Sequence, residues 1–269
     1  MPAEDVRAEL ARVAAYYDTL PGRRWRPLLD TTYDPIVQAR RPQPWSSWIR
    51  GEDYYSEGML IWLEADAKVR ELTGGRRSMD DFARAFFGVN PGDEGDLTYR
   101  FEDVAGTLGT IAPFDWASWL RQRVEQTGSA PLAWIEAEGY RLVYRDTPTA
   151  YFTAREKARK ILDLTYTLGL VIGENGRVGS VAWDSPPFEA GITTGSTIVA
   201  VNGRQYSHDL MKQAITAARG TRTPIRLLVK RGELYSEVAL DYHDGLRYPV
   251  LERVGSGASS LDALLAPRS

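Results

Sequence analysis

Cysteine is absent from the 269 residues of the sequence, and histidine is nearly so. Without a thiol, the chain can form no disulfide framework, carries no cysteine nucleophile and offers no thiolate to a metal. The only histidines are His208 and His243, both in the last third of the chain and each followed by an aspartate. Stability must therefore come from packing, and imidazole chemistry is confined to two positions.

The sequence also lacks a long hydrophobic run and an excess of charge of either sign. No uncharged apolar stretch approaches the roughly 20 residues of a membrane-spanning helix. The N-terminal segment alternates charge with alanine and leucine instead of forming a signal-peptide core. A total of 33 basic and 36 acidic residues gives a formal net charge of -3, too small to favour nucleic acid or a membrane surface as a partner. We expect a soluble protein with neither partner.

What remains is the composition of a folded protein, with 43% apolar and 26% charged residues. At this length we expect two domains, each with its own core. Apolar residues recur at helical spacing in the first half, whereas short alternating runs follow Gly139. Expected helices cover 4–20, 54–72, 78–88, 101–108, 114–125 and a segment after Ser207; expected strands cover 169–172, 179–183, 197–201, 225–230 and 234–241.

These boundaries predict an α+β chain in three parts. A helical domain covers residues 1–138. A β-rich domain follows at 139–245, with its core at 164–242. The tail, 246–269, includes a stretch of small and polar residues, so we expect it to be flexible.

The β-rich domain carries three linked motifs. Residues 185–192 are SPPFEAGI, followed by GSTI at 195–198 and VNG at 201–203. In this order they resemble the Pro-Ala-x-x-Ala-Gly-Leu, Gly-Asp-x-Ile and Val-Asn-Gly run of bacterial PDZ domains. Gly191 can close a short helical turn, and Asn202 with Gly203 suits a tight turn with positive φ. The resemblance implies a PDZ-like β-sandwich or barrel with one or two helices.

A PDZ domain binds a peptide as an added strand at a sheet edge, and backbone N–H groups of the preceding loop hold the terminal carboxylate. The resemblance therefore implies a groove for peptide or protein C-termini between residues 166–172 and the helix after Ser207. Its lining would be Tyr166, Thr167, Leu168, Gly169, Leu170, Val171, Ile172, His208, Met211 and Ile215. His208 either bonds a ligand hydroxyl or is an exposed polar residue of the first helical turn. The groove either takes a peptide or only docks against the helical half.

The helical half carries a second resemblance. Residues 53–58, 63–70 and 78–82 are similar, in order and spacing, to the latter part of the catalytic domain in the bacterial glycyl aminopeptidase family. These are PDZ-containing zinc metallopeptidases related to the thermolysin-like aminopeptidases. The resemblance covers nearly the whole chain and implies that the helical subdomain is the back half of a gluzincin-type catalytic domain. It also implies a bacterial protein, either periplasmic or cytoplasmic.

Members of that family bind zinc through His-Glu-x-x-His and a later glutamate, which leave an open position for an activated water. Those ligands precede the segment that begins here, and this sequence has no such motif. We therefore expect no cofactor in this chain, although zinc belongs to the complete family protein. The chain is expected to be a C-terminal fragment, inactive without its N-terminal catalytic half, from an enzyme acting on small N-terminal residues such as Gly or Ala. The alternatives are a stand-alone PDZ adaptor and a purely structural remnant.

One catalytic role is still implied. Related aminopeptidases carry a Tyr-x-x-Gly element whose phenol bonds the oxyanion of the tetrahedral intermediate, and residues 55–58, YSEG, match its spacing. A phenol is protonated at neutral pH and can donate to developing negative charge. Tyr55 is thus the candidate catalytic residue and Tyr54 the alternate; the other interpretation is core packing at a helix N-terminus. The relatives usually have lysine where Glu57 stands, so the local electrostatics should differ.

Overall fold

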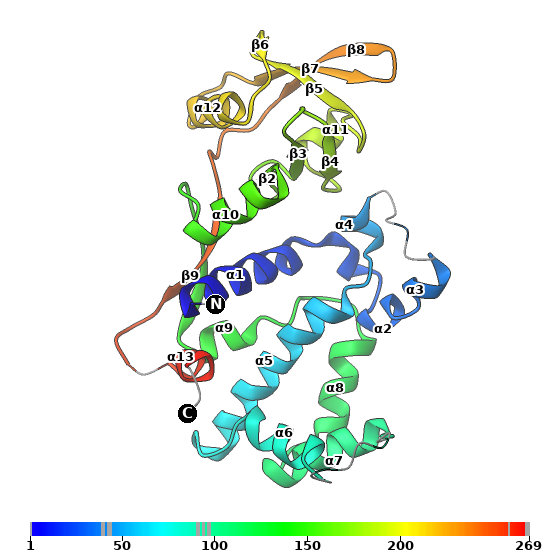
Figure 1. Cartoon of the computed structure of the whole chain (residues 1–269), viewed down its shortest axis with the longest axis vertical. Coiled ribbons are helices and arrows are strands. Elements are labelled where there is room, and N and C mark those ends of the chain that lie inside the picture. The colour runs from blue at the N-terminus through cyan, green and yellow to red at the C-terminus, as the bar shows by residue number, and fades with distance from the viewer. Residues whose placement is uncertain are drawn as a thin grey trace.

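The computed structural model describes residues 2–38, 41, 45–89, 92, 95, 98–257 and 259–266. A helical half occupies the lower part of the elongated molecule in Figure 1, and a β-rich half lies above it. The helices of the lower half are α1 (Ala3–Thr19), the 3-10 turn η1 (Pro21–Arg24), α2 (Leu28–Thr31), α3 (Asp34–Val37), α4 (Ser46–Ile49), α5 (Tyr54–Thr73), α6 (Met79–Phe87), α7 (Phe101–Ile111), α8 (Trp116–Glu125) and α9 (Ala133–Ala137).

Helix α5 is the central element of the helical half, because it contributes to two cores. On one side Leu60 packs with α1 and with Trp134 of α9. On the other side Ile61 and Val69 pack with residues of α6, α7 and α8. A helix that is apolar around most of its circumference is buried in this way, as its sequence predicts. It ends at Gly74, whose φ of +60° closes the last turn.

Helix α6 begins at a capping box. The Ser78 hydroxyl accepts the N–H of Asp80 at 3.2 Å, and the Asp81 carboxylate accepts the N–H of Ser78 at 2.9 Å. Asp66 of α5 also supports this start, because it accepts the Met79 N–H at 2.7 Å while pairing with Arg70 at 2.6 Å. Asp66 is therefore a structural residue, in keeping with its spacing from Arg70.

The β-rich half contains two sheets around one core. The first has the order β2-β3-β4 and the second the order β6-β5-β7-β8. Their strands are β2 (Ile161–Leu164), β3 (Leu170–Gly173), β4 (Val178–Val181), β5 (Thr197–Val201), β6 (Arg204–Gln205), β7 (Ile225–Arg231) and β8 (Leu234–Leu240), and the helices are α10 (Ala150–Arg159), α11 (Pro186–Glu189) and α12 (His208–Ala218). The expected sandwich or barrel is corrected in one respect: these described strands do not close into a barrel.

The C-terminal residues correct a second expectation, the flexible tail at 246–269. Strand β9 (Tyr248–Arg253) pairs antiparallel with β1 (Tyr140–Arg145) over six residue pairs. Helix α13 (Ser260–Leu265) follows, and its Leu261 is fully buried in the core beside α1. The physical reason is that both segments have apolar partners far away in sequence. Residues 258 and 267–269 of this tail lie outside the described part.

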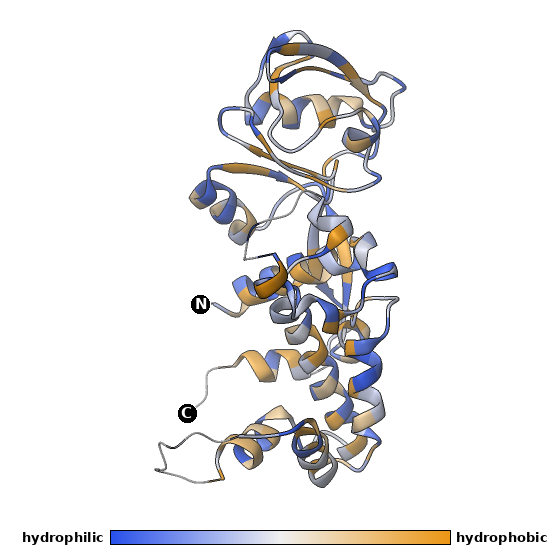
Figure 2. Cartoon of the chain, turned by 90° about the vertical axis from the view of Figure 1, so that its right-hand side faces the viewer, coloured by the Kyte–Doolittle hydropathy of each residue, from blue (hydrophilic) through white to orange (hydrophobic). Residues whose placement is uncertain are grey.

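Hydrophobic and hydrophilic residues are interspersed along the helices of both halves (Figure 2). Among the described residues, no helix combines the length and the apolar character needed to cross a membrane.

The docking of α13 predicts a cost for trimming its buried leucine. Leu261→Ala should lower the free energy of unfolding by about 2–4 kcal/mol, because it removes apolar contacts and leaves a cavity. Leu234→Ala is the matched control, since Leu234 is 72% exposed and should tolerate the same change. Denaturant unfolding of both variants measures the difference. Equal, small effects would mean that the C-terminal helix does not pack as described.

Candidate functional site

Tyr55 stands on the surface at the first turn of α5. Its side chain is 71% exposed, so it is not a core residue. Tyr54 is half-buried beside it, with the two ring centroids 4.5 Å apart. The helix spacing places Met59 and Trp62, both partly exposed, on the same face as Tyr55. The candidate catalytic phenol therefore lies on an apolar face of α5.

Tyr54 has a different environment. Its hydroxyl donates to a carboxylate oxygen of Glu52 at 3.3 Å. Loss of solvation, the Tyr55 phenol and the Glu52 carboxylate raise the pKa of Tyr54 to about 12. The Tyr54 phenol is thus protonated at neutral pH but has a carboxylate partner already, so of the two tyrosines Tyr55 is the more open.

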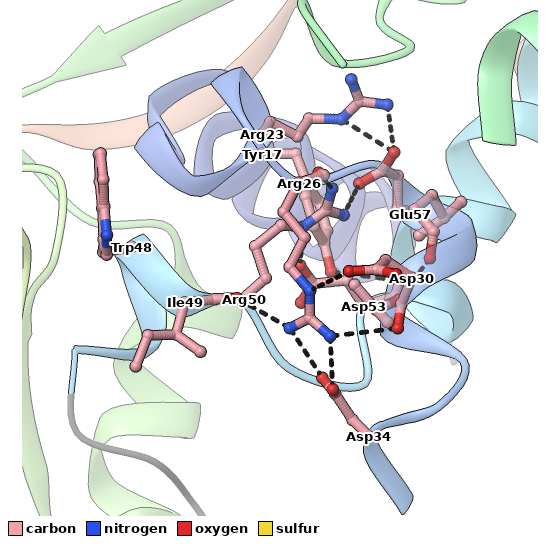
Figure 3. A network of polar contacts seen from close by, with 12 residues as sticks. Tyr17, Arg23, Arg26, Asp30, Asp34, Trp48, Ile49, Arg50, Asp53 and Glu57 are labelled. Carbon is pink, nitrogen blue, oxygen red and sulfur yellow. Dashed lines mark hydrogen bonds and ion pairs between the residues drawn. The ribbon is translucent and has the colours of Figure 1, made fainter. Parts of the chain in front are cut away.

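A buried network of ion pairs lies beneath this turn (Figure 3). Glu57 is 0% exposed and accepts from two guanidinium groups. Arg23 Nε donates to its Oε1 at 2.8 Å, and Arg50 Nη2 donates to its Oε2 at 2.5 Å. Charge-assisted pairs of this kind are among the stronger side-chain interactions when fully satisfied. Related enzymes are expected to have lysine at this position. Here the negative charge of Glu57 is balanced by the positive charges of Arg23 and Arg50.

Arg50 ties several backbone segments to this network. Its Nε donates to Asp53 Oδ2 at 2.7 Å and its Nη1 to the carbonyl of Arg26 at 2.7 Å. Its own φ is +69°, a conformation that L-residues rarely adopt and that persists only when surrounding contacts hold it. Gly22 packs against it so closely that a Cβ there would lie 2.6 Å from Arg50 Cγ. The approach of η1 to this arginine thus requires glycine.

Two neighbouring segments join the same network. Arg23 Nη1 also donates to the carbonyls of Gly128 and Ser129, at 3.1 and 2.8 Å. Arg26 Nη2 donates to Asp34 Oδ1 at 2.6 Å, and Arg26 Nη1 to the carbonyl of Ile49 at 2.9 Å. The first turn of α5 is therefore fixed to η1, α3, α4 and the loop after α8.

The donor set for a metal is missing from the described residues. They bring together no group of three or more His, Cys, Asp or Glu side chains that could hold an ion. The carboxylates of the buried network face guanidinium groups instead. A zinc ion therefore does not fit the described part of this chain.

The network predicts a large cost for neutralising its central acid. Glu57→Gln should lower the free energy of unfolding by about 3–5 kcal/mol, because the buried Arg23 loses its carboxylate partner and the buried Arg50 loses one of its two. Glu71→Gln, at an exposed pair with Lys68, should cost less than about 1 kcal/mol. Urea unfolding of the two variants gives the comparison. A cost for Glu57→Gln as small as that of the control would contradict the described network.

The expected peptide-binding residues form a second region in the β-rich half. Leu168, Leu170 and Ile172 lie in the same buried core as Met211 and Ile215 of α12. Val171 is half-buried on the opposite face of β3. The structure therefore brings residues of the loop, the strand and the helix into one core.

The loop between β2 and β3 is tightly held. The Tyr166 hydroxyl donates to the carbonyl of Arg12 at 2.6 Å, and the Thr167 hydroxyl accepts the N–H of Arg247 at 3.0 Å. Gly169 has φ +76°, and a Cβ there would lie 2.7 Å from the Cβ of Ser185. Both the positive φ and the close approach of Ser185 therefore exclude a side chain at position 169.

The expected open sheet edge is not found. Strand β3 pairs antiparallel with β4 on one side and with β2 on the other. The N–H groups of Thr167, Leu168 and Gly169 all donate to the carbonyl oxygen of Leu164, at 3.1, 2.9 and 3.0 Å. The groups expected to receive a ligand carboxylate are thus engaged within the chain. Sequence reasoning missed β2, which was placed in no strand.

The two histidines differ in their surroundings. His208, at the start of α12, is half-buried, and its Nε2 is enclosed without a hydrogen-bond partner among the described residues. His208 is therefore not an exposed polar residue, which was one of the two interpretations of its position. His243 lies beyond β8, with Nε2 2.7 Å from Asp241 Oδ1 and Nδ1 3.1 Å from the carbonyl of Ala218 at the end of α12.

The contacts of His243 predict a pH dependence. The hydrogen bonds to Asp241 and Ala218 raise the pKa of His243, so the folded state favours the imidazolium. Its stabilising contribution is complete below the unfolded pKa, near 6.5, and is lost as pH rises through the folded value. The difference in unfolding free energy between wild type and His243→Gln should therefore be largest in acid and shrink as pH rises. A difference that does not change with pH would contradict this assignment.

An aromatic joint connects the two regions. The indole rings of Trp48 on α4 and Trp183 after β4 stack with centroids 5.0 Å apart. Trp45 and Phe188 pack against the same ring, with centroids 5.8 and 4.5 Å from that of Trp183. The Ser47 hydroxyl accepts the Trp183 N–H at 2.8 Å. Since α4 leads directly to Arg50, the joint and the buried network are adjacent parts of one segment.

Comparison with known proteins identifies the fold. No family model matches the chain, and no curated protein does. The chain is similar to the crystal structure of an aminopeptidase N family protein from Idiomarina loihiensis, with 13% identity and a TM-score of 0.73 over 99% of this chain and 45% of that chain. At this identity the match shows the fold alone.

Of the expected resemblance to the glycyl aminopeptidase family, the coarser part, an aminopeptidase-like fold, is confirmed, and the match does not show that family. The chain spans less than half the length of the similar protein. The HtrA3 PDZ domain bound to a phage-derived ligand also matches, with 23% identity over 42% of this chain and 85% of that chain. Its TM-score of 0.21 carries no argument.

Proposed function

We propose that this chain is the C-terminal part of a zinc aminopeptidase of the glycyl aminopeptidase type, in which Tyr55 stabilises the oxyanion. The observation that carries the proposal is the position of Tyr55, exposed on an apolar helix face within an aminopeptidase-like fold. The zinc ligands would come from sequence outside these 269 residues, since the described residues do not fit the ion. Its substrates would be peptides with small N-terminal residues such as Gly or Ala.

The chemistry of Tyr55 follows from its phenol. When water adds to a peptide carbonyl, negative charge develops on the carbonyl oxygen, and a fixed O–H donor stabilises that charge more than it stabilises the substrate. One such donor is worth about 3–4 kcal/mol. The benefit depends on a donor held in place before the reaction, and the buried pairs of Glu57, two residues along the same helical turn, supply that rigidity.

The apolar face of α5, formed by Tyr55, Met59 and Trp62, would be covered by the missing N-terminal catalytic half. On α6 the ring of Phe87 is exposed as well, and it is connected to Trp62 through the buried Phe82, with ring centroids 6.4 and 5.5 Å from that of Phe82. Large apolar side chains exposed together are typical of an interface. This chain covers 45% of the similar solved structure, so more than half of that protein has no counterpart in this chain.

The β-rich half would be a PDZ-like domain. Its support is local geometry: Gly191, Asn202 and Gly203 all have positive φ, as the first and third motifs predict, and Ser185 caps α11. A stand-alone adaptor for peptide C-termini is the weaker candidate, because both edges of β3 are paired.

The proposal predicts the effect of removing one hydroxyl. In the longer protein, which carries this chain with its upstream coding sequence, Tyr55→Phe should lower kcat for alanyl and glycyl substrates by about 10²–10³-fold, with little change in KM. Tyr54→Phe is the matched control and should stay within about twofold of wild type, since the Tyr54 hydroxyl is already bonded to Glu52.

Two results would overturn this proposal. One is a Tyr55→Phe enzyme with unchanged kcat. The other is an upstream reading frame that lacks His-Glu-x-x-His, because no source of zinc ligands would then remain.

A further inference from the structure

Strand β2 occupies the edge of β3 to which a peptide would add. The two strands run antiparallel, with Leu162 opposite Ile172, Asp163 opposite Val171, and Leu164 opposite Leu170. The last residue of β2 therefore lies beside the loop, at the end where a bound peptide would have its C-terminus.

The loop binds the carbonyl of Leu164 through the backbone N–H groups that would bind the terminal carboxylate of a peptide. Three consecutive backbone N–H groups, those of Thr167, Leu168 and Gly169, converge on its carbonyl oxygen within 3.1 Å. Successive N–H groups that point at one oxygen form the kind of concavity that holds an anion or a carboxylate. Here that concavity holds a peptide carbonyl of the same chain.

The side chains of β2 belong to the same core as those of β3 and α12. Leu162 and Leu164 are fully buried in the same core as Met211 and Ile215 of α12. The outer edge of β2 is held by Glu156 of α10, which accepts the N–H of Asp163 at 2.8 Å and the ammonium group of Lys212 on α12 at 3.1 Å. Strand β2 is thus connected to β3 on one side and, through one carboxylate, to α12 on the other.

We propose that the groove between β3 and α12 is a carboxylate-terminated peptide site filled in cis by residues 161–164, with Leu164 in the place of the ligand's last residue. A free peptide with leucine at its last and third-last positions binds only when β2 leaves. This inference rests on the PDZ-like part of the proposed function and is independent of Tyr55.

The contacts that hold β2 identify the element that would have to move. Besides Glu156, α10 contributes Arg155, which pairs with Asp163 at 2.8 Å. Lys160 connects α10 to β2 in a left-handed conformation, φ +54°, which costs free energy for a residue with a Cβ. Helix α10 and β2 together therefore form the strap over the groove.

The test uses a fluorescein-labelled peptide that ends in Ile-Leu-Asp-Leu with a free carboxylate, and its C-terminal amide as a control. Wild type and Lys157→Ala, a change at an exposed neighbour on α10, should show no saturable binding at about 1 mM peptide. Glu156→Ala should bind the free carboxylate, and bind the amide at least about tenfold more weakly.

A disulfide gives the converse experiment, because the chain has no other cysteine. Asp163 and Val171 lie opposite each other on β2 and β3. The N–H of Asp163 donates to Glu156 and not to Val171, so the two residues form a non-hydrogen-bonded pair. Such pairs are about 4.5 Å apart at Cα, within the range that a disulfide spans. In a Glu156→Ala background, the oxidised Asp163→Cys/Val171→Cys pair should abolish binding, and reduction should restore it.

Hydrogen exchange of the loop amides shows whether β2 has left its place in each variant. The amides of Thr167, Leu168 and Gly169 should exchange slowly in wild type and at least about tenfold faster in Glu156→Ala. Fast exchange there in wild type, or tight peptide binding by wild type, would overturn the inference. If Glu156→Ala leaves exchange unchanged, Leu164→Lys is the second variant, since it places a charge in the apolar pocket. The inference would also be overturned if β2 opens in either variant, as fast exchange shows, and the peptide still does not bind. That result would leave the test of Tyr55 unaffected.

Discussion

The carboxylate of Glu57, enclosed between the guanidinium groups of Arg23 and Arg50, is the interaction on which the helical half depends. Taking a charge out of water costs several kcal/mol, which is recovered only when the geometry and the remaining hydrogen bonds are satisfied. Here they are satisfied by both arginines, which also donate to the backbone carbonyls of three further residues, Gly128, Ser129 and Arg26. The arrangement fixes where α5 begins, and hence where Tyr55 points.

The same constraint extends to the β-rich half through α4. Arg50 follows α4 directly, and its backbone, with a φ of +69°, is held by its three partners. Trp48 and Ser47, immediately before it, contact Trp183 of the β-rich half. The segment that positions the candidate catalytic turn is therefore also the segment that joins the halves.

Much of the local structure could be predicted from the sequence, because its signals are local. Gly74 ends α5, Ser78 begins α6 and Ser207 begins α12, each as expected from cap chemistry. Strand β9 and helix α13 were missed as elements because their partners lie far away in the sequence; β2, which pairs with the neighbouring β3, was missed as well. Strand β9, for example, pairs with β1 more than 100 residues earlier.

The candidate site shows the same division. The spacing of residues 55–58 located Tyr55, but only its burial distinguishes an exposed phenol from a core residue. Glu57 could be recognised as a departure from related enzymes, whereas its partners at positions 23 and 50 have no periodic relation to it. The residues expected to line the groove lie in one core with α12, whereas β2, which pairs with β3, was not predicted.

The central claim is that this chain holds one part of a peptidase site and not the metal-binding part. Hydrolysis of alanyl and glycyl substrates by the purified 269-residue chain, measured with added zinc and again with excess chelator, tests it most directly. The account predicts no metal-dependent release of the N-terminal residue above background. Chelator-sensitive turnover by this chain alone would contradict it.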